Sequence, residues 1–328
     1  MTLIALLGGC TSTSVTEKYQ DKRNDIINVK DKVIEFETGN VLIGSVSRLY
    51  MSNKCLLIAD HKSVDKQIHI FNKNDFSYLT SIGNFGEGPE EITVMGCLAI
   101  DEAHHQLYVS DHAKQKIFSY DMDSVMVDSL YKPQVKTAMN ETLFPSEYQY
   151  INDTLSIAVL IKPTSTSTFN QFLGRWNMNT GEMIPMKYTH PDIQKKRITF
   201  AASEKAGIYV ECYTRHDLMT ICSLDGELLY NIYGPDWDGG NGNKLQSFGT
   251  VMIGNDKIFV SYCGEDYARD SFPTKILVFD LEGNYLKTLE TGYKISDCCY
   301  DSFNNRIILS LNDVVPVSYT HLTLPTIA

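Results

Sequence analysis

The sequence predicts an all-β fold, a six-bladed β-propeller of four-stranded antiparallel blades in which the last blade is incomplete. A strand that ends in an aromatic or aliphatic residue before Asn or Asp recurs along the chain, at Phe71, Tyr120, Trp176, Leu224 and Phe279. The steps between these markers are 49, 56, 48 and 55 residues, and a period of about fifty residues is typical of propeller blades. Each repeat holds several short strand patterns separated by turn residues, without a convincing amphipathic helix.

The blades follow one another along the chain with little between them. The repeats predict blades at residues 41–86, 92–132, 146–188, 198–234 and 248–290, and a sixth that begins with strands at 293–300 and 306–311. A short strand at 33–36 is expected to complete the sixth blade, because a ring closed in this way leaves no exposed strand edge. The third strand of that blade is expected to be missing.

Length and composition fit one large globular domain. The chain has 328 residues, of which 43% are hydrophobic and 21% are charged, and its formal net charge is -11. A negative charge of this size opposes a phosphate backbone, and no basic run interrupts it. Nucleic acid is therefore not an expected partner. The protein is also expected to be a monomer.

The N-terminus carries a membrane-targeting signal. An apolar run at residues 3–9 leads directly into Cys10, and Leu7-Gly8-Gly9-Cys10 resembles a lipobox, the motif at which a bacterial signal peptide is cut and the cysteine acylated. The basic start of a signal peptide is missing, so residues 1–10 are interpreted as a truncated lipoprotein signal peptide. The alternative is a chance cysteine after a short apolar start. Residues 11–30 are expected to be a flexible tether, and residues 31–315 the propeller.

The last residues have an unusual character. Residues 316–328 include Pro-Val-Ser-Tyr-Thr-His-Leu-Thr-Leu-Pro-Thr, which resembles the translation of a sequencing adapter. We interpret this segment as a non-native tail and exclude it from the predicted fold. The alternative is a genuine polar C-terminal strand.

The cysteines do not form a metal-binding pattern. Seven remain after Cys10, without a CxxC pair or a cluster of histidines, which disfavours structural zinc. Cys212 and Cys222 flank a predicted hairpin turn. They are either bridged across the hairpin or, as is usual for free cysteines, buried as small apolar residues.

A glycine-rich run connects the first two predicted blades. Residues 83–91 read Gly-x-x-Gly-x-Gly-Pro-x-Glu, and with later segments at 248–257 and 300–306 they resemble the TolB-like six-bladed propeller lipoproteins of Gram-negative gut anaerobes. The resemblance covers residues 31–313 and implies the propeller fold and a lipid-anchored location in the cell envelope, but no activity. The run lacks the Lys-Ser/Thr pair of a phosphate-binding loop, so we interpret it as an inter-blade connection.

Candidate binding residues follow from the topology. In a propeller the turns between second and third strands emerge on one face and, with the inter-blade loops, surround one mouth of the central channel. Those turns and loops carry the predicted binding-face residues His61, Glu87, Glu90, His112, Arg215, His216, Glu265, Asp266 and Arg269.

Two functions remain open from the sequence. The first is an envelope-anchored binding module for a protein or glycan partner, without a cofactor. The alternative is a metal-dependent enzyme of the lactonase or hydrolase kind with its site at the channel mouth. No Ser-His-Asp or Cys-His set can be assembled from the sequence, and no metal ligands are assigned.

Overall fold

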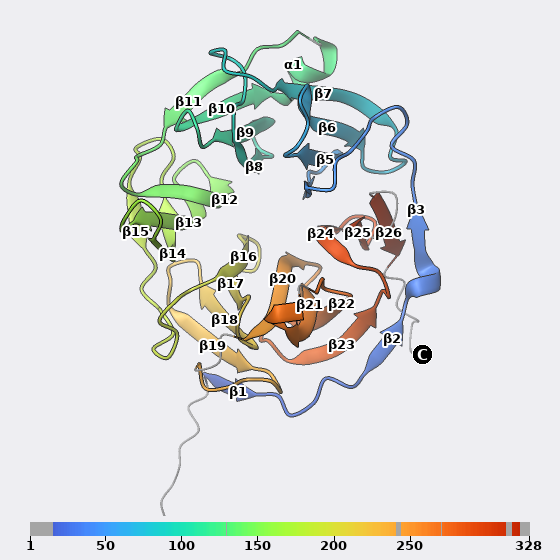
Figure 1. Cartoon of the computed structure of the whole chain (residues 1–328), viewed down its shortest axis with the longest axis vertical. Coiled ribbons are helices and arrows are strands. Elements are labelled where there is room, and N and C mark those ends of the chain that lie inside the picture. The colour runs from blue at the N-terminus through green and yellow to red at the C-terminus, as the bar shows by residue number, and fades with distance from the viewer. Residues whose placement is uncertain (1–15, 129, 241–243, 270, 313–316, 322–328) are drawn as a thin grey trace, which may run out of the picture.

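The computed structural model is a ring of six β-sheets around a central channel (Figure 1). It describes residues 16–128, 130–240, 244–269, 271–312 and 317–321. Every sheet contains the four antiparallel strands of one blade, and these strands are consecutive in the chain in all blades but the sixth. The predicted six-bladed propeller is therefore confirmed. The one α-helix in the described part of the chain, α1 (Met122–Val127), caps the end of a strand in blade two.

The first three blades contain strands β4 to β15. Blade one is β4 (Ser47–Met51), β5 (Cys55–Asp60), β6 (Lys66–Asn72) and β7 (Tyr78–Asn84). Blade two is β8 (Met95–Asp101), β9 (Gln106–Asp111), β10 (Lys116–Asp121) and β11 (Gln134–Ala138). Blade three is β12 (Phe144–Asn152), β13 (Leu155–Pro163), β14 (Phe169–Trp176) and β15 (Met183–Pro185).

The last three blades contain the remaining strands. Blade four is β16 (Ile198–Ser203), β17 (Ile208–Tyr213), β18 (Leu218–Ser223) and β19 (Leu228–Tyr233). Blade five is β20 (Leu245–Gly254), β21 (Lys257–Asp266), β22 (Lys275–Asp280) and β23 (Tyr285–Glu290). Blade six is β24 (Ile295–Asp301), β25 (Arg306–Leu311), β26 (Val317–His321) and β3 (Val33–Glu35).

The core lies between the blades. Six clusters of buried apolar side chains fill the six interfaces between neighbouring blades. The second strand of a blade packs against a neighbour on each side, so β5, β17 and β25 are buried along their whole length. This is why these strands are mostly apolar and do not alternate between apolar and polar residues.

The N-terminal segment differs from the predicted tether. Residues 16–36, called the strap below, run along the outer rim of the ring (Figure 1). Within the strap, β1 (Glu17–Tyr19) pairs in parallel with β19, and β2 (Ile26–Asn28) pairs in parallel with β23. The outer edges of blades four and five offer unpaired backbone groups, which the strap satisfies. Residues 17–28 are therefore part of the fold rather than a free linker.

The sixth blade also differs from the prediction, because it has four strands. The predicted strand at 33–36 does complete the blade, as β3 pairs with β26. The third strand, β26, is formed by residues of the segment excluded as a tail. Backbone pairing with the open edge of β25 explains this, since a β-prone run can complete a ladder whatever its origin. That the segment is non-native stays a prediction.

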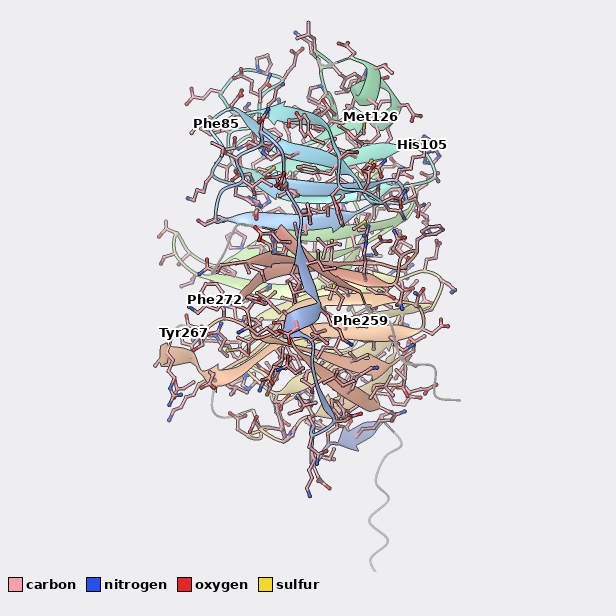
Figure 2. All side chains as sticks on the ribbon, turned by 90° about the vertical axis from the view of Figure 1, so that its right-hand side faces the viewer. Phe85, His105, Met126, Phe259, Tyr267 and Phe272 are labelled. Carbon is pink, nitrogen blue, oxygen red and sulfur yellow. The ribbon has the colours of Figure 1, made fainter. Side chains whose placement is uncertain are left out.

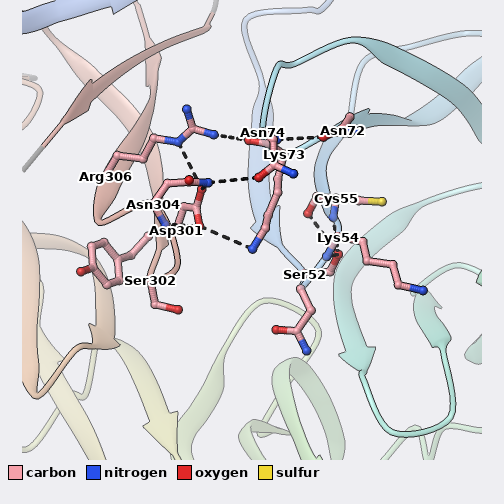
Figure 3. A network of polar contacts seen from close by, with 12 residues as sticks. Ser52, Lys54, Cys55, Asn72, Lys73, Asn74, Asp301, Ser302, Asn304 and Arg306 are labelled. Carbon is pink, nitrogen blue, oxygen red and sulfur yellow. Dashed lines mark hydrogen bonds and ion pairs between the residues drawn. The ribbon is translucent and has the colours of Figure 1, made fainter.

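The ring closes through a network of buried charges between blades six and one (Figure 3). The Asp301 carboxylate, which is fully buried, accepts a hydrogen bond from Arg306 Nε at 3.1 Å and one from Asn304 Nδ2 at 2.7 Å. Lys73 Nζ lies 3.6 Å from the other carboxylate oxygen, and Arg306 also donates to the backbone carbonyl of Lys73. The network therefore joins residues more than two hundred positions apart.

A second buried pair fixes the strap. Arg23 Nη1 lies 2.8 Å from Asp217 Oδ1, and the two side chains are 7% and 0% exposed. The guanidinium also packs near the rings of Tyr262, Phe279 and Phe248, with centroid distances of 5.4 to 5.8 Å. Arg23 thus anchors the strap at the interface between blades four and five.

The cysteines that the structure describes form no disulfide bond. All seven cysteines that the structure describes are free and buried. Cys212 lies opposite Met219 and Cys222 opposite Tyr209, so the interpretation as buried apolar residues holds and the bridge does not form. Within the described ranges, no helix has the length and apolar character needed to cross a membrane.

Candidate site at the mouth of the central channel

The two faces of the disc carry different connections. The turns from second to third strands, such as those after Asp60 and Asp111, lie on one face, called the loop face below. Figure 2 shows Phe85, Tyr267 and Phe272 on this side of the disc and His105 and Met126 on the other. Buried aspartates at the turns hold the loops in place, since Asp60 accepts from Gly44 N and Asp111 from Thr93 N, each at 2.8 Å.

The channel contains a cavity of about 470 Å³ that is lined by the first strand of every blade. Its polar lining residues are Arg48, Tyr50, Glu102, Glu147, Tyr148, Gln149, Tyr150, Thr199, Thr250, Asp297 and Tyr300. First strands lie next to the axis of a propeller, so side chains distant in sequence converge there. The cavity is therefore the one place where all six blades contribute to the same surface.

An ion pair spans the loop-face end of the cavity. Arg48 of β4 donates from Nη2 to Glu147 Oε1 of β12 at 2.7 Å, joining blade one to blade three. The two side chains are 38% and 39% exposed. Such an exposure leaves both groups within reach of a molecule that enters the channel, and it limits what the pair adds to stability.

Asp297 is held beside this pair by fixed donors. Its Oδ1 accepts from Thr250 Oγ1 at 2.6 Å and its Oδ2 from the backbone N of Leu49 at 2.7 Å. Burial raises the pKa of Asp297, although the hydrogen bond from Thr250 and the charge of Arg48 act in the opposite direction. Both carboxylate oxygens are thus committed to blades one and five.

Two histidines lie at the mouth. His61 follows β5, and its Nδ1 donates to the backbone carbonyl of Met95 at 3.2 Å. His112 follows β9 and packs against Gly96, where any Cβ would collide with its Nε2. Each Nε2 is buried without a hydrogen-bond partner among the described residues.

These histidines interact with the ion pair. Burial lowers the pKa of His61, and the charge of Arg48 lowers it further. Burial likewise lowers the pKa of His112, against the opposing effect of Asp111 and Glu147. Both shifts favour the neutral imidazole. Two of the nine predicted binding-face residues thus lie beside the channel charges.

The other predicted residues are dispersed around the loop face. Glu87 is exposed, and Glu90 pairs with Lys132 at 2.7 Å. The Arg215 guanidinium lies over the ring of Tyr267, while Glu265 pairs with Arg269 at 2.9 Å and Asp266 is exposed.

One predicted residue differs in kind. His216 is 5% exposed and packs against Trp237, with its Nδ1 3.5 Å from Asp238 Oδ1. It is buried beneath the loops of blade four because its turn is short and folds inward, so it is not a surface binding residue as expected.

Sequence reasoning missed Arg48, Glu147 and Asp297. Each is a charged residue inside a first strand whose neighbours are mostly apolar. An alignment of the six repeats on their first strands would have placed them in one layer around the axis. The predicted binding-face residues were instead taken from turns and loops, because functional residues of a propeller usually lie there.

A possible metal-binding group lies elsewhere. In the part of the chain that the structure describes, one group of three residues has suitable spacing, namely Asp101, His104 and Asp153. It lies at the ends of strands on the face opposite the loop face, and Asp101 is already bonded to His104 Nδ1 at 2.8 Å. The described residues therefore offer no such group at the channel mouth, where the enzyme alternative requires one.

The fold and the channel define a six-bladed propeller with a polar axial cavity. A family model described as a 6-bladed beta-propeller, DUF5128, matches residues 12–171. No functionally curated protein matches the chain.

Several solved structures share the fold. A Bacteroides fragilis protein named as a candidate exported protein is 13% identical, with a TM-score of 0.56 over 90% of this chain and 87% of that one. The β-propeller domain of Cps50 (Swd1) from Myceliophteria thermophila is 10% identical, with a TM-score of 0.55 over 86% and 98%. A DUF4221 protein of Bacteroides vulgatus is 10% identical, with a TM-score of 0.54 over 84% and 91%. At these identities the similarity concerns the fold alone.

Proposed function

We propose that the protein is a binding module of the cell envelope that holds a small polar molecule, or the end of a glycan, in the mouth of its central channel. The observation that carries the proposal is the convergence of Arg48, Glu147 and Asp297 from three blades on one cavity at the axis of the ring. Partly desolvating charged side chains costs free energy, which favours a role in binding over a purely structural one.

The geometry fits polar ligands. Guanidinium, carboxylate and hydroxyl groups provide both donors and acceptors, as hydroxyl-rich ligands require. Tyr50, Tyr150 and Phe200 add aromatic surface to the lining, against which a sugar ring can pack. A cavity of about 470 Å³ accommodates a ligand of a few hundred cubic ångströms rather than a protein domain.

The location in the envelope is part of the same proposal. It is supported by the lipobox-like segment that ends at Cys10, which lies outside the described residues, and by the fold shared with a candidate exported protein of Bacteroides fragilis. Metabolic labelling with a palmitate analogue tests it. We expect label on the full chain and none on Cys10→Ala; equal labelling of both would contradict the anchor.

Binding is tested with a glycan array and with ligand-observed NMR against a library of small polar metabolites. We expect at least one class of ligand to bind the native protein and to lose at least tenfold in affinity with Arg48→Met. The matched control is Arg175→Met, which removes an exposed arginine that pairs with Asp225 on the outside of the ring. Binding that Arg48→Met leaves unchanged would contradict a site in the channel.

A further inference from the structure

The Arg48 guanidinium has hydrogen-bond donors that no described residue uses. Arg48 carries five N–H groups, and in the described part of the chain one of them is bonded, to Glu147 Oε1. The Arg48 side chain is 38% exposed and lines the cavity, so its other N–H groups are accessible to a ligand that enters the channel.

The neighbouring acids use one of the Arg48 donors. Asp297 is bonded on one side by Thr250 and on the other by the backbone of Leu49, so its oxygens are committed. Glu147 makes a single bond to Arg48 and is 39% exposed, so it can turn towards solvent at little cost. The free edge of the guanidinium is therefore open to another oxyanion.

The histidines favour the same kind of ligand. His61 faces Asp60, Arg48 and His112, and His112 faces Asp111 and Glu147. Each imidazole has an unpartnered Nε2, which becomes a hydrogen-bond donor once it is protonated. An anion bound between them and Arg48 would stabilise their protonated forms.

From this geometry we propose that the ligand of the channel carries a carboxylate, which Arg48 binds directly while His61 and His112 lie close by. A planar carboxylate matches the fork of a guanidinium better than a hydroxyl group does. The net charge of -11 disfavours polyanions and leaves a single acidic group on a small molecule as the matching class. This inference rests on the proposed function and specifies its ligand class.

The test compares galacturonate with galactose, which share a ring but differ in the carboxylate, and adds glycolate, a single carboxylate without a ring. Isothermal titration is expected to give at least tenfold tighter binding of galacturonate than of galactose. If glycolate binds with similar affinity, the carboxylate alone is the recognised group, whatever molecule carries it. If galacturonate binds tightly and glycolate does not bind, the ligand is an acidic sugar.

The pH dependence gives an independent readout. The carboxylates of galacturonate and glycolate stay ionised between pH 5.5 and 7.5. Because the pKa values of His61 and His112 are lowered in the free protein, anion binding is coupled to proton uptake, so affinity should rise at least fivefold as pH falls from 7.5 to 5.5. The double variant with His61→Asn and His112→Asn should flatten this dependence.

Variants separate charge recognition from folding. Arg48→Met should abolish the preference for galacturonate, Arg48→Lys should keep part of it, and Arg175→Met should leave it unchanged, with circular dichroism confirming that each variant folds. Equal affinity for galactose and galacturonate, or galacturonate binding that survives Arg48→Met, would overturn the inference. A neutral glycan that binds in an Arg48-dependent manner would preserve the proposed function while refuting the carboxylate. Absence of binding by all probes and by every ligand of the library would refute both.

Discussion

The seam between blades six and one and the mouth of the channel are built from the same kinds of residue but satisfy them differently. At the seam, Asp301 is fully buried and receives bonds from Arg306 and Asn304. At the mouth, Arg48 and Glu147 share one bond and are more than a third exposed. The charges of the seam are buried and paired with one another, as a structural role requires, whereas the donors of Arg48 are accessible to an external molecule.

The largest expected effect is at the seam. Asp301→Ala removes the carboxylate that Arg306 and Lys73 share and leaves both cations buried at 4% and 10% exposure. Loss of one partner from a buried pair costs about 3–5 kcal/mol. Urea denaturation should therefore show a much lower free energy of unfolding. A change below about 1 kcal/mol would show that the charges of the seam contribute no more to stability than an exposed ion pair.

The strap should respond in the same way but less strongly. Arg23→Ala leaves Asp217 with weaker contacts, from the backbone N of Asp236 at 3.2 Å and the Tyr262 hydroxyl at 3.4 Å. We expect a loss of about 3 kcal/mol. The measurement is urea denaturation, accompanied by proteolysis of the strap. A strap that is cleaved no faster than in the native protein would show that Arg23 does not hold it.

Acid should weaken the seam through Asp301. Burial alone would raise the pKa of Asp301, but the hydrogen bonds from Asn304 and the charges of Lys73 and Arg306 outweigh it, so the pKa is lowered. A lowered pKa in the folded state means stability that is present above the unfolded value of about 3.9 and is lost as pH falls further. The native protein should thus lose more stability than Asp301→Ala between pH 5 and pH 3, as measured by thermal unfolding. Parallel losses in the two proteins would contradict this role.

The smallest effect on stability is expected at the mouth. Arg48→Met breaks a half-exposed pair, which contributes about 0–1 kcal/mol, so unfolding in urea should hardly change. The control Arg175→Met should behave alike, because its pair is also exposed. A loss above about 3 kcal/mol for Arg48→Met would place Arg48 with the structural charges of the seam.

The blades could be predicted because they repeat. Buried second strands such as β5 and β17 are short, mostly apolar runs bounded by turns, and one recurs in each predicted blade. The strap could not be predicted, since β1 and β2 are three-residue strands that pair through their backbones and leave no periodic pattern. In the same way, an alternating first strand does not indicate which of its faces meets the axis, so Arg48 and Glu147 were not identified.

The most direct test of the account is a crystal structure with the ligand that the binding assays select. The account predicts electron density in the channel, within hydrogen-bonding distance of Arg48 and beside His61 and His112. Density elsewhere would contradict it, for example in the 330 Å³ pocket lined by Leu79 and Met126 between blades one and two.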